Sequence, residues 1–329
     1  MRVRAVLIDR TGGPEVLRPG EIEVGEPGPG EVRVRHEAIG VNFIDIYHRS
    51  GLYPVALPAV LGTEAAGVVE AVGAGVTHVA IGDRVAYATR TPGSYAAARV
   101  LDATPVVRLP DSIDTARGAA MMLKGLTVGY LLLRTPPPLG ALVPGDAIVW
   151  HAAAGGVGLI ACQWARALGL RLIATAGSAD KCALALRHGA AHAIDYRRDD
   201  VVARVRELTA GAGVKVVFDS VGKDTWERSL DCLRPLGLMV SFGNASGPVP
   251  PVDLGQLMRK GSLYVTRPML GTHTAKRADV EALAAALFAQ VAAGAIVIDA
   301  PRSYPLADAA RAHTDLDARA TTGASVLVP

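Results

Sequence analysis

Residues 147–158 constrain the fold of this chain more than any other segment. The apolar run 147–150 predicts a β-strand, and the small residues after it lead into a helical pattern at 159–168. Another strand is predicted at 171–175. A turn of small residues between a strand and a helix lets backbone N–H groups approach a pyrophosphate at the helix N-terminus, where the helix dipole favours negative charge. The segment therefore indicates a dinucleotide site.

The glycines of this turn follow the dinucleotide fingerprint G-x-G-x-x-G with one departure. Ala153 stands in place of the first glycine, and Gly155 and Gly158 supply the second and third. The motif alone is weak evidence, because a flexible loop has a similar composition. Its position between a predicted strand and a predicted helix makes the indication strong.

Composition places the chain among globular proteins and argues against several function classes. Of its 329 residues 50% are hydrophobic and 20% charged, and the net charge is only +3. The arginines are scattered without a basic run, so nucleic-acid binding is not indicated. Without a C-x-x-C pair, no cysteine-rich zinc site is expected. The first residues alternate like a strand and lack the apolar run of a signal peptide, so a soluble cytoplasmic protein without a membrane partner is expected.

Hydrophobic patterns divide the chain into two kinds of structure. The first 120 or so residues contain short β-like runs between Gly and Pro residues, which predict a small irregular β-barrel. From about residue 125 strands alternate with amphipathic helices such as 199–209 and 223–233, which predicts a doubly wound parallel sheet and hence an α/β protein. The expected strands of that sheet are 147–150, 171–175, 192–195, 214–218, 237–242 and 262–265.

The expected domain organisation places the parallel sheet inside the barrel domain. The first part of a catalytic domain is expected at 1–124, a nucleotide-binding domain at 125–265 and a return to the catalytic domain at 266–329. The last part begins with a long Ala-rich helix over 279–293 and ends in a short strand. The Pro-rich residues 135–140 predict a surface loop.

Ordered motifs along nearly the whole chain resemble one family. They are GVNFIDIYHRSGLYP at 40–54, LKGLT at 123–127, HAAAGGVG at 151–158, DSVG at 219–222, VSFGN at 240–244 and GSLYVTRP at 261–268. Together they resemble the medium-chain dehydrogenase/reductase superfamily, and within it the zinc-free NADPH:quinone oxidoreductases, the family that includes ζ-crystallin. The resemblance implies a GroES-like β-barrel catalytic domain with a Rossmann domain inserted into it.

The resemblance also shows where this chain departs from zinc-dependent alcohol dehydrogenases. Asn42 stands in place of their first zinc-ligating cysteine, and Gly62-Thr63-Glu64 replaces Gly-His-Glu. Without a thiolate and an imidazole at these places no tetrahedral zinc site is expected. Glu64 is then expected to form hydrogen bonds rather than to bind a metal.

Reduction of an electron-poor acceptor needs no metal, because positioning against the nicotinamide supplies most of the catalysis. The resemblance implies that Asn42, Tyr47 and Tyr53 line the acceptor cavity, with Asn42 and a tyrosine hydroxyl donating to a quinone oxygen. The tyrosines alternatively only pack at the mouth of the barrel. Asp45 is either a hydrogen-bond relay or a helix cap.

The predicted strand at 171–175 is followed by no carboxylate until Asp180. An acidic residue there would select NADH by binding the ribose 2′-hydroxyl, so its absence favours NADPH. The resemblance implies a 2′-phosphate pocket of Ser178, Lys181 and Tyr196, with Arg319 from the C-terminal region. The other cofactor-binding residues that it implies are Thr127, Gly155, Gly156, Val157, Ser220, Phe242, Gly243 and Asn244.

The expected activity is the NADPH-dependent, zinc-independent reduction of a quinone. The alternatives are reduction of activated alkenes such as enones and 2-haloacrylates, or an RNA-binding or crystallin-like role. The apolar run 263–265 is expected at the edge of the parallel sheet, which favours a homodimer. His273, expected in a loop near the acceptor, and the long connection 135–143 depart from the family pattern, and His273 bears on substrate preference.

Overall fold

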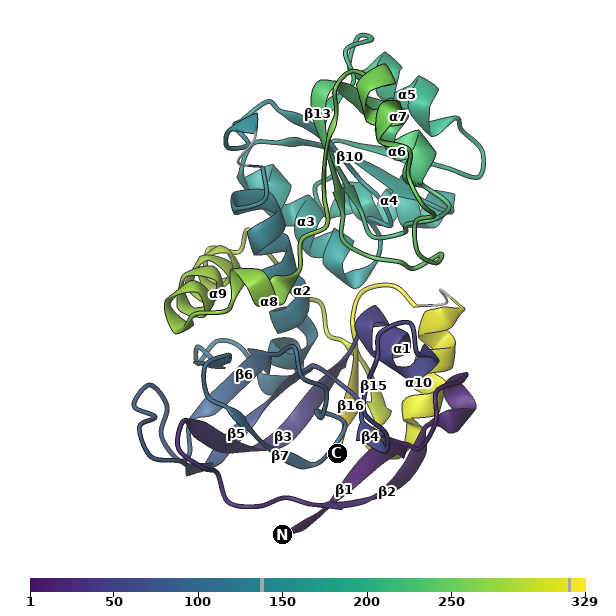
Figure 1. Ribbon diagram of the computed structural model, residues 1–329. Helices are drawn as coiled ribbons and strands as arrows, with labels where there is room; N and C mark the ends of the chain where they lie inside the picture. The colour runs from purple at the N-terminus through teal and green to yellow at the C-terminus, as the bar shows by residue number, and fades with distance from the viewer. Residues whose placement is uncertain (137–138, 319–320) are drawn as a thin grey trace. The chain divides into compact units, whose positions relative to one another are not determined.

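The computed structural model describes residues 1–136, 139–318 and 321–329, which form two compact units. Unit 1 comprises Met1–Leu126, His273–Ala292 and Ile298–Pro329, and unit 2 comprises Thr127–Thr272 and Ala293–Val297. Each unit has its own sheets (Figure 1) and its own cluster of buried hydrophobic residues. The domain boundaries expected from sequence patterns stay a prediction.

Two sheets make up most of unit 1 within the described residues, and all their strand pairs are antiparallel except the parallel pair β15–β16. A three-stranded sheet has the order β2-β1-β4, and a larger sheet has the order β15-β16-β3-β5-β6-β8, with β7 also paired to β3. The strands are β1 (Arg2–Ile8), β2 (Arg18–Glu23), β3 (Glu31–Val41), β4 (Ala59–Val60), β5 (Glu64–Val72), β6 (Arg84–Ala88), β7 (Ala98–Asp102), β8 (Val106–Arg108), β15 (Arg302–Pro305) and β16 (Ser325–Val328). The helices are α1 (Phe43–Ser50), α9 (Arg277–Ala292), α10 (Ala309–Asp317), η1 (Pro14–Val16) and η3 (Leu306–Asp308).

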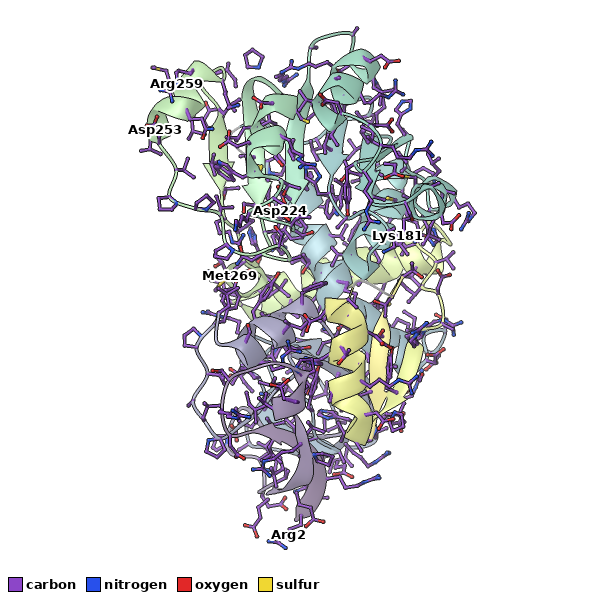
Figure 2. All side chains as sticks on the ribbon, turned by 90° about the vertical axis from the view of Figure 1, so that its right-hand side faces the viewer. Arg2, Lys181, Asp224, Asp253, Arg259 and Met269 are labelled. Atoms are coloured by element: carbon purple, nitrogen blue, oxygen red, sulfur yellow. The ribbon has the colours of Figure 1, made fainter. Side chains whose placement is uncertain are left out.

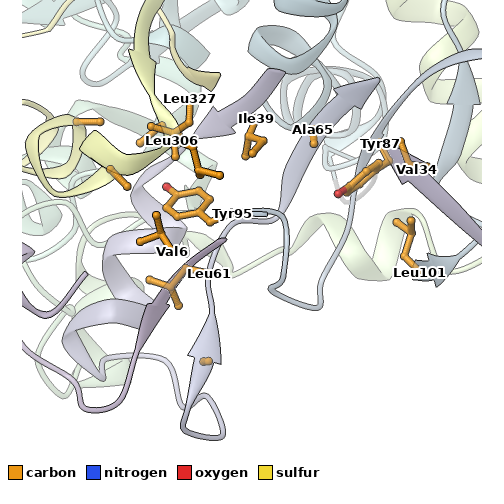
Figure 3. Packing of buried hydrophobic residues seen from close by; sticks show 14 of the residues in the cluster. Val6, Val34, Ile39, Leu61, Ala65, Tyr87, Tyr95, Leu101, Leu306 and Leu327 are labelled. Carbon is orange, nitrogen blue, oxygen red and sulfur yellow. The ribbon is translucent and has the colours of Figure 1, made fainter. Parts of the chain in front are cut away.

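The long strand β3 organises unit 1 because it pairs with β5, β7 and β16. The C-terminal strand β16 runs antiparallel to it, with Ser325 opposite Val41. Val32 and Val34, two residues apart on one face of β3, are fully buried. The ring of Tyr95 lies in the same core, where Figure 3 shows it between Val6 and Leu306. Strands from both ends of the chain therefore share one core.

Unit 2 contains a six-stranded sheet in the order β11-β10-β9-β12-β13-β14, and every pair is parallel. This is the strand order 3-2-1-4-5-6 of the Rossmann fold, so the predicted doubly wound sheet is confirmed. The strands are β9 (Ala147–Trp150), β10 (Arg171–Ala176), β11 (His192–Asp195), β12 (Val214–Asp219), β13 (Leu233–Ser241) and β14 (Tyr264–Thr266). The helices are α3 (Gly156–Ala167), α4 (Ala179–Arg187), α5 (Val201–Leu208), α6 (Trp226–Cys232) and α7 (Leu254–Arg259). Helices α2 (Thr115–Leu133) and α8 (Leu270–His273) include residues of both units.

Both faces of the parallel sheet are covered. The neighbours Ile148 and Val149 point to opposite faces of β9, and both are fully buried. Val149 packs with α5 and α6 through Val205 and Leu230. Helices connecting parallel strands account for this burial, which is why the strands read as continuous apolar runs in the sequence.

Two expectations need correction, and a third falls partly outside the described residues. The strand expected at 262–265 begins at Tyr264, because Ser262 has a φ of 56° and belongs to the preceding turn. His273 lies at the end of the short helix α8 and not in a loop. The Pro-rich connection at 135–143 includes residues 137–138, which lie outside the described residues.

Among the helices described, none is long and apolar enough to cross a membrane.

Candidate active site

Most cofactor candidates of unit 2 follow the carboxyl ends of parallel strands. Residues 155–157 follow β9, Ser178 follows β10, Tyr196 follows β11, Ser220 follows β12, and 242–244 follow β13. Because these strands are neighbours and parallel, their ends meet at one edge of the sheet. Ligands of open α/β sheets bind at this edge.

The turn after β9 is held by backbone contacts that only small residues permit. Ala152 has a φ of 53°, in the left-handed region, and the Ala153 N–H donates to the Thr175 carbonyl at 3.1 Å. A Cβ on Gly158 would lie 2.5 Å from both Cα and O of Ala153. Gly155 is the N-cap of the twelve-residue helix α3. Gly158 thus allows α3 to lie directly against the turn, which is the role of the third fingerprint glycine.

A buried hydrogen-bond network lies beneath this turn. His151 Nε2 is 3.0 Å from Ser229 Oγ, and Ser229 Oγ donates to Asp219 Oδ2 at 2.8 Å. Because the Ser229 hydroxyl donates its hydrogen bond to Asp219, it can only accept from His151. His151 Nε2 therefore carries a proton and donates to Ser229 Oγ. The other ring nitrogen, Nδ1, accepts from Thr175 Oγ1 at 2.8 Å. Burial lowers the pKa of His151, which keeps the ring neutral. The network ties together the ends of β9, β10 and β12 and helix α6.

Residues of the expected 2′-phosphate pocket gather beyond β10. Ser178 is the N-cap of α4 and accepts from the Lys181 N–H at 3.3 Å. The Tyr196 hydroxyl would be only 2.5 Å from a Cβ on Gly177, so it lies against this turn. Lys181 is half-buried in the first turn of α4 and is labelled in Figure 2. Arg319 lies outside the described residues.

The ends of β12 and β13 also approach closely. A Cβ on Gly243 would lie 2.4 Å from the Ser220 carbonyl oxygen, and the Phe242 N–H donates to the Asp219 carbonyl at 2.8 Å. Arg267 donates through Nη1 to Gly243 O at 2.9 Å, and also to Ser241 Oγ. In the sequence Arg267 appears only within the motif at 261–268, and nothing there indicated that its side chain would hydrogen-bond to the turn at Gly243. Thr127, on α2, is half-buried, and Asn244 follows Gly243 in the same turn.

These observations fit a dinucleotide. Two close backbone approaches at this edge, at Gly158 and Gly243, leave no space for a side chain. A helix N-terminus opens at the same edge, where its N–H groups and dipole favour phosphate. An edge where the backbone can approach closely and N–H groups can donate suits a pyrophosphate and its two nucleotides.

In unit 1, Asn42 and Asp45 form the start of helix α1. Asn42 is the N-cap, and its N–H donates to Asp45 Oδ2 at 2.9 Å. The cap role considered for Asp45 is therefore present. Asp45 is fully buried and also accepts from the Tyr95 hydroxyl at 3.1 Å. Burial raises the pKa of Asp45 to about 7, against the opposing effect of these hydrogen bonds.

Arg49 fixes the direction of donation in a chain of hydrogen bonds that ends at Asp45. Arg49 Nη1 can only donate, so His313 Nδ1, 3.1 Å away, accepts. His313 then carries its proton on Nε2, which donates to the Tyr95 hydroxyl at 2.8 Å. Burial lowers the pKa of His313 to about 3, which keeps the ring neutral. This hydrogen-bond chain runs from Arg49 through His313 and Tyr95 to the accepting carboxylate of Asp45. It connects helix α1 to helix α10.

Glu64 forms hydrogen bonds, as expected. Its Oε2 accepts from Asn42 Nδ2 at 2.8 Å and from Lys124 Nζ at 3.1 Å, and its Oε1 accepts from the Leu123 N–H at 2.7 Å. A Cβ on Gly40 would lie 2.1 Å from Glu64 Oε2, so only glycine fits opposite this carboxylate. Sequence reasoning did not find Lys124 as a partner, because it lies 60 residues from Glu64.

The two candidate tyrosines are neighbours. The rings of Tyr47 and Tyr53 meet edge to face with centroids 5.2 Å apart, and the Tyr53 N–H donates to the Tyr47 carbonyl at 3.0 Å. Tyr47 is buried and Tyr53 half-buried. His48 packs against Tyr53, and burial lowers its pKa. No group of three or more His, Cys, Asp or Glu side chains suited to a metal ion occurs in the described part of the chain.

Comparisons with known proteins agree with this architecture. Residues 28–111 match the family model described as alcohol dehydrogenase GroES-like domain, and residues 156–290 match the model described as zinc-binding dehydrogenase. The first region contains strands β3 to β8 of unit 1, and the second contains strands β10 to β14 of the parallel sheet.

Relatives cover nearly the whole chain. A quinone oxidoreductase of Pseudomonas aeruginosa is 56% identical over 97% of both chains, and a 2-haloacrylate reductase of Burkholderia sp is 42% identical over 99% of both. The crystal structure of Escherichia coli quinone oxidoreductase complexed with NADPH has a TM-score of 0.95 at 50% identity and covers 99% of this chain and 100% of that one. The fold and these relatives are those of a medium-chain dehydrogenase/reductase. Within that superfamily, the chain belongs to the zinc-free quinone oxidoreductase family.

Proposed function

We propose that this protein is an NADPH-dependent reductase of quinones that works without zinc. The observation that carries this proposal is the likeness, over nearly the full chain, to a quinone oxidoreductase whose structure contains NADPH. The donors at the sheet edge of unit 2 and the buried polar cluster around Asn42 supply the two kinds of site that the reaction needs.

Three groups of residues are proposed to hold the cofactor. Gly155, Gly156 and Val157 bind the pyrophosphate at the start of α3. Ser178, Lys181 and Tyr196 bind the 2′-phosphate, which no carboxylate repels at the end of β10. The remaining contacts are assigned to Thr127, Ser220, Phe242, Gly243 and Asn244. When bound, NADPH supplies the hydride.

The acceptor is proposed to contact Asn42, Tyr47 and Tyr53. One N–H of the Asn42 side-chain amide donates a hydrogen bond to Glu64, and the second can donate to a quinone oxygen. The paired tyrosine rings offer an aromatic face and a hydroxyl to the acceptor. Asp45 positions Asn42 through the N-cap hydrogen bond.

Activated alkenes are a second candidate class of acceptor. The 42% identical relative named 2-haloacrylate reductase covers 99% of this chain. Hydride addition to a haloacrylate or an enone also places negative charge next to a carbonyl, so the same residues serve either acceptor.

We further propose a cytoplasmic homodimer that pairs through β14, the edge strand of the parallel sheet.

The activity is tested by following NADPH oxidation at the nicotinamide absorbance. The acceptors are 1,4-benzoquinone, 9,10-phenanthrenequinone, 2-chloroacrylate and an enone, and NADH is the control cofactor. Turnover of a quinone with NADPH and little with NADH is expected. If only the alkenes react, the quinone assignment is wrong. If neither cofactor binds, the assignment of the sheet edge is wrong.

The cofactor preference has its own test in Lys181→Ala. Loss of the ammonium should raise the Kd of NADPH about tenfold, which is about 1.4 kcal/mol, and leave the Kd of NADH unchanged. Fluorescence titration with each cofactor measures both values. An equal change for the two cofactors would show that Lys181 does not contact the 2′-phosphate.

A further inference from the structure

The ammonium of Lys124 is buried and incompletely hydrogen-bonded. Lys124 is 5% exposed, and among the described residues its Nζ has one acceptor, Glu64 Oε2 at 3.1 Å. An ammonium carries three N–H donors, so two of them have no acceptor within the described protein. Buried donors are ordinarily satisfied, and a buried cation that lacks acceptors is costly.

A second buried lysine shows what a purely structural site looks like in this chain. Lys215, 8% exposed, donates to Asp146 Oδ2 at 2.8 Å and to Ala141 O at 3.0 Å. Lys215 therefore has an anionic partner and a further acceptor. Lys124 has the anionic partner alone, which leaves it more donors for a ligand.

Because Lys124 and Asn42 both donate to the same oxygen of Glu64, their positions indicate which kind of ligand can use the remaining donors of Lys124. Both side chains donate to the same oxygen, Glu64 Oε2, at 3.1 and 2.8 Å. Their nitrogens are therefore less than about 6 Å apart, and an oxygen that approaches the free proton of Asn42 is within reach of the ammonium. Glu64 is fully buried and held by the Leu123 N–H, so it fixes both donors.

We propose that Lys124 is a further catalytic residue, which donates an N–H to the acceptor's carbonyl oxygen beside Asn42 and stabilises the negative charge that develops there. Glu64 is the positioning residue for both donors. The acceptor class that this pair recognises is a conjugated carbonyl compound whose oxygen becomes anionic on reduction. The inference rests on the proposed function, since Asn42 is assigned there to the acceptor.

Kinetics of Lys124→Met and Lys124→Gln test this role. Glutamine keeps a donor for Glu64 without the charge, and it serves as the folded variant if methionine destabilises the core. In both, kcat for 1,4-benzoquinone should fall about 10²–10³-fold, as when an oxyanion donor is removed, and the Kd of NADPH should change less than about twofold. Lys215→Met is the matched control and should lower the melting temperature while kcat is kept.

A readout independent of turnover is the ionisation of bound 4-nitrophenol. The wild type and Lys215→Met should bind it as the yellow phenolate at a pH below that needed in water, and Lys124→Gln should abolish this shift. If the wild type shows no shift, or if folded Lys124→Gln keeps kcat within about threefold, Lys124 has no such role. A wild type that shifts nitrophenol but reduces neither quinone nor alkene would contradict the proposed function and leave the anion-stabilising role of Lys124 in place.

Discussion

At the scale of single residues, glycine is required where the turn after β9 meets helix α3. A helical Gly→Ala change ordinarily stabilises a helix by about 1 kcal/mol. At Gly158, however, a Cβ would lie 2.5 Å from backbone atoms of Ala153, and backbone cannot move aside as a flexible side chain does. The clash should outweigh the helix propensity.

Gly158→Ala is therefore expected to lower the free energy of unfolding by about 1–3 kcal/mol and to weaken NADPH binding. Thermal unfolding and fluorescence titration measure the two effects. Gly25→Ala is the control, because a Cβ there meets nothing within 4 Å and no positive φ is involved. Equal melting temperatures for the two variants would refute the close approach of α3 to the turn.

His36 shows how a single buried group couples stability to pH. Its Nδ1 donates to the Ala96 carbonyl at 2.7 Å, and its Nε2 accepts from the Tyr87 hydroxyl at 2.8 Å. Burial, helped by the charge of Arg99, lowers its pKa from 6.5 to about 4. The folded protein therefore binds this proton more weakly than the unfolded chain does. Stability from neutral His36 is present above pH 6.5 and is lost as the pH falls toward 4.

Urea unfolding at pH 7 and pH 5 tests this sign with His36→Asn, whose amide can still donate to Ala96. The wild type should lose about 2 kcal/mol more than the variant between the two pH values. Asp45, with its raised pKa, and the other buried histidines titrate in both proteins, so their contributions cancel in the comparison. Parallel losses would mean that His36 is not buried in its neutral form.

At the scale of elements, most of the Rossmann strands could be located from the sequence, because a strand covered on both faces is a short apolar run between turn residues. The strand expected at 147–150 has those bounds in the structure. The contacts that hold the site could not be predicted in this way. Glu64 meets Lys124 and His151 meets Ser229 across 60 and 78 residues, and no local pattern encodes such pairs.

The His151 network is expected to fix the turn after β9 to β12 and α6. Ser229→Ala removes the acceptor of His151 Nε2 and one donor to Asp219, so it should cost about 1–3 kcal/mol of stability and raise the Kd of NADPH. Urea unfolding and cofactor titration measure these effects. Thr314→Ala removes an exposed hydroxyl bonded within α10 and is the control, with a change of a few tenths of a kcal/mol. If the two alanine variants are alike, the network does not support the turn.

At the scale of the whole molecule, the parallel sheet ends in a strand that invites pairing. On β14, Tyr264 and Val265 are 44% and 40% exposed, and the strand has one neighbour, β13, in the described sheet. Exposed apolar edge strands are ordinarily charged, covered or paired with another strand. A twofold copy would cover this edge with the same strand and extend the sheet across both chains.

Sedimentation of the wild type should therefore give a dimer at micromolar concentration. Val265→Lys places a charge in the proposed interface, where its burial without a partner is costly, and should shift the protein toward monomer. Val297→Lys is the matched control, because Val297 is 58% exposed in the same unit but lies outside the parallel sheet. A monomeric wild type would contradict the pairing outright. A dimer that persists in Val265→Lys would place the interface elsewhere, since a charged edge cannot close against its own copy without cost.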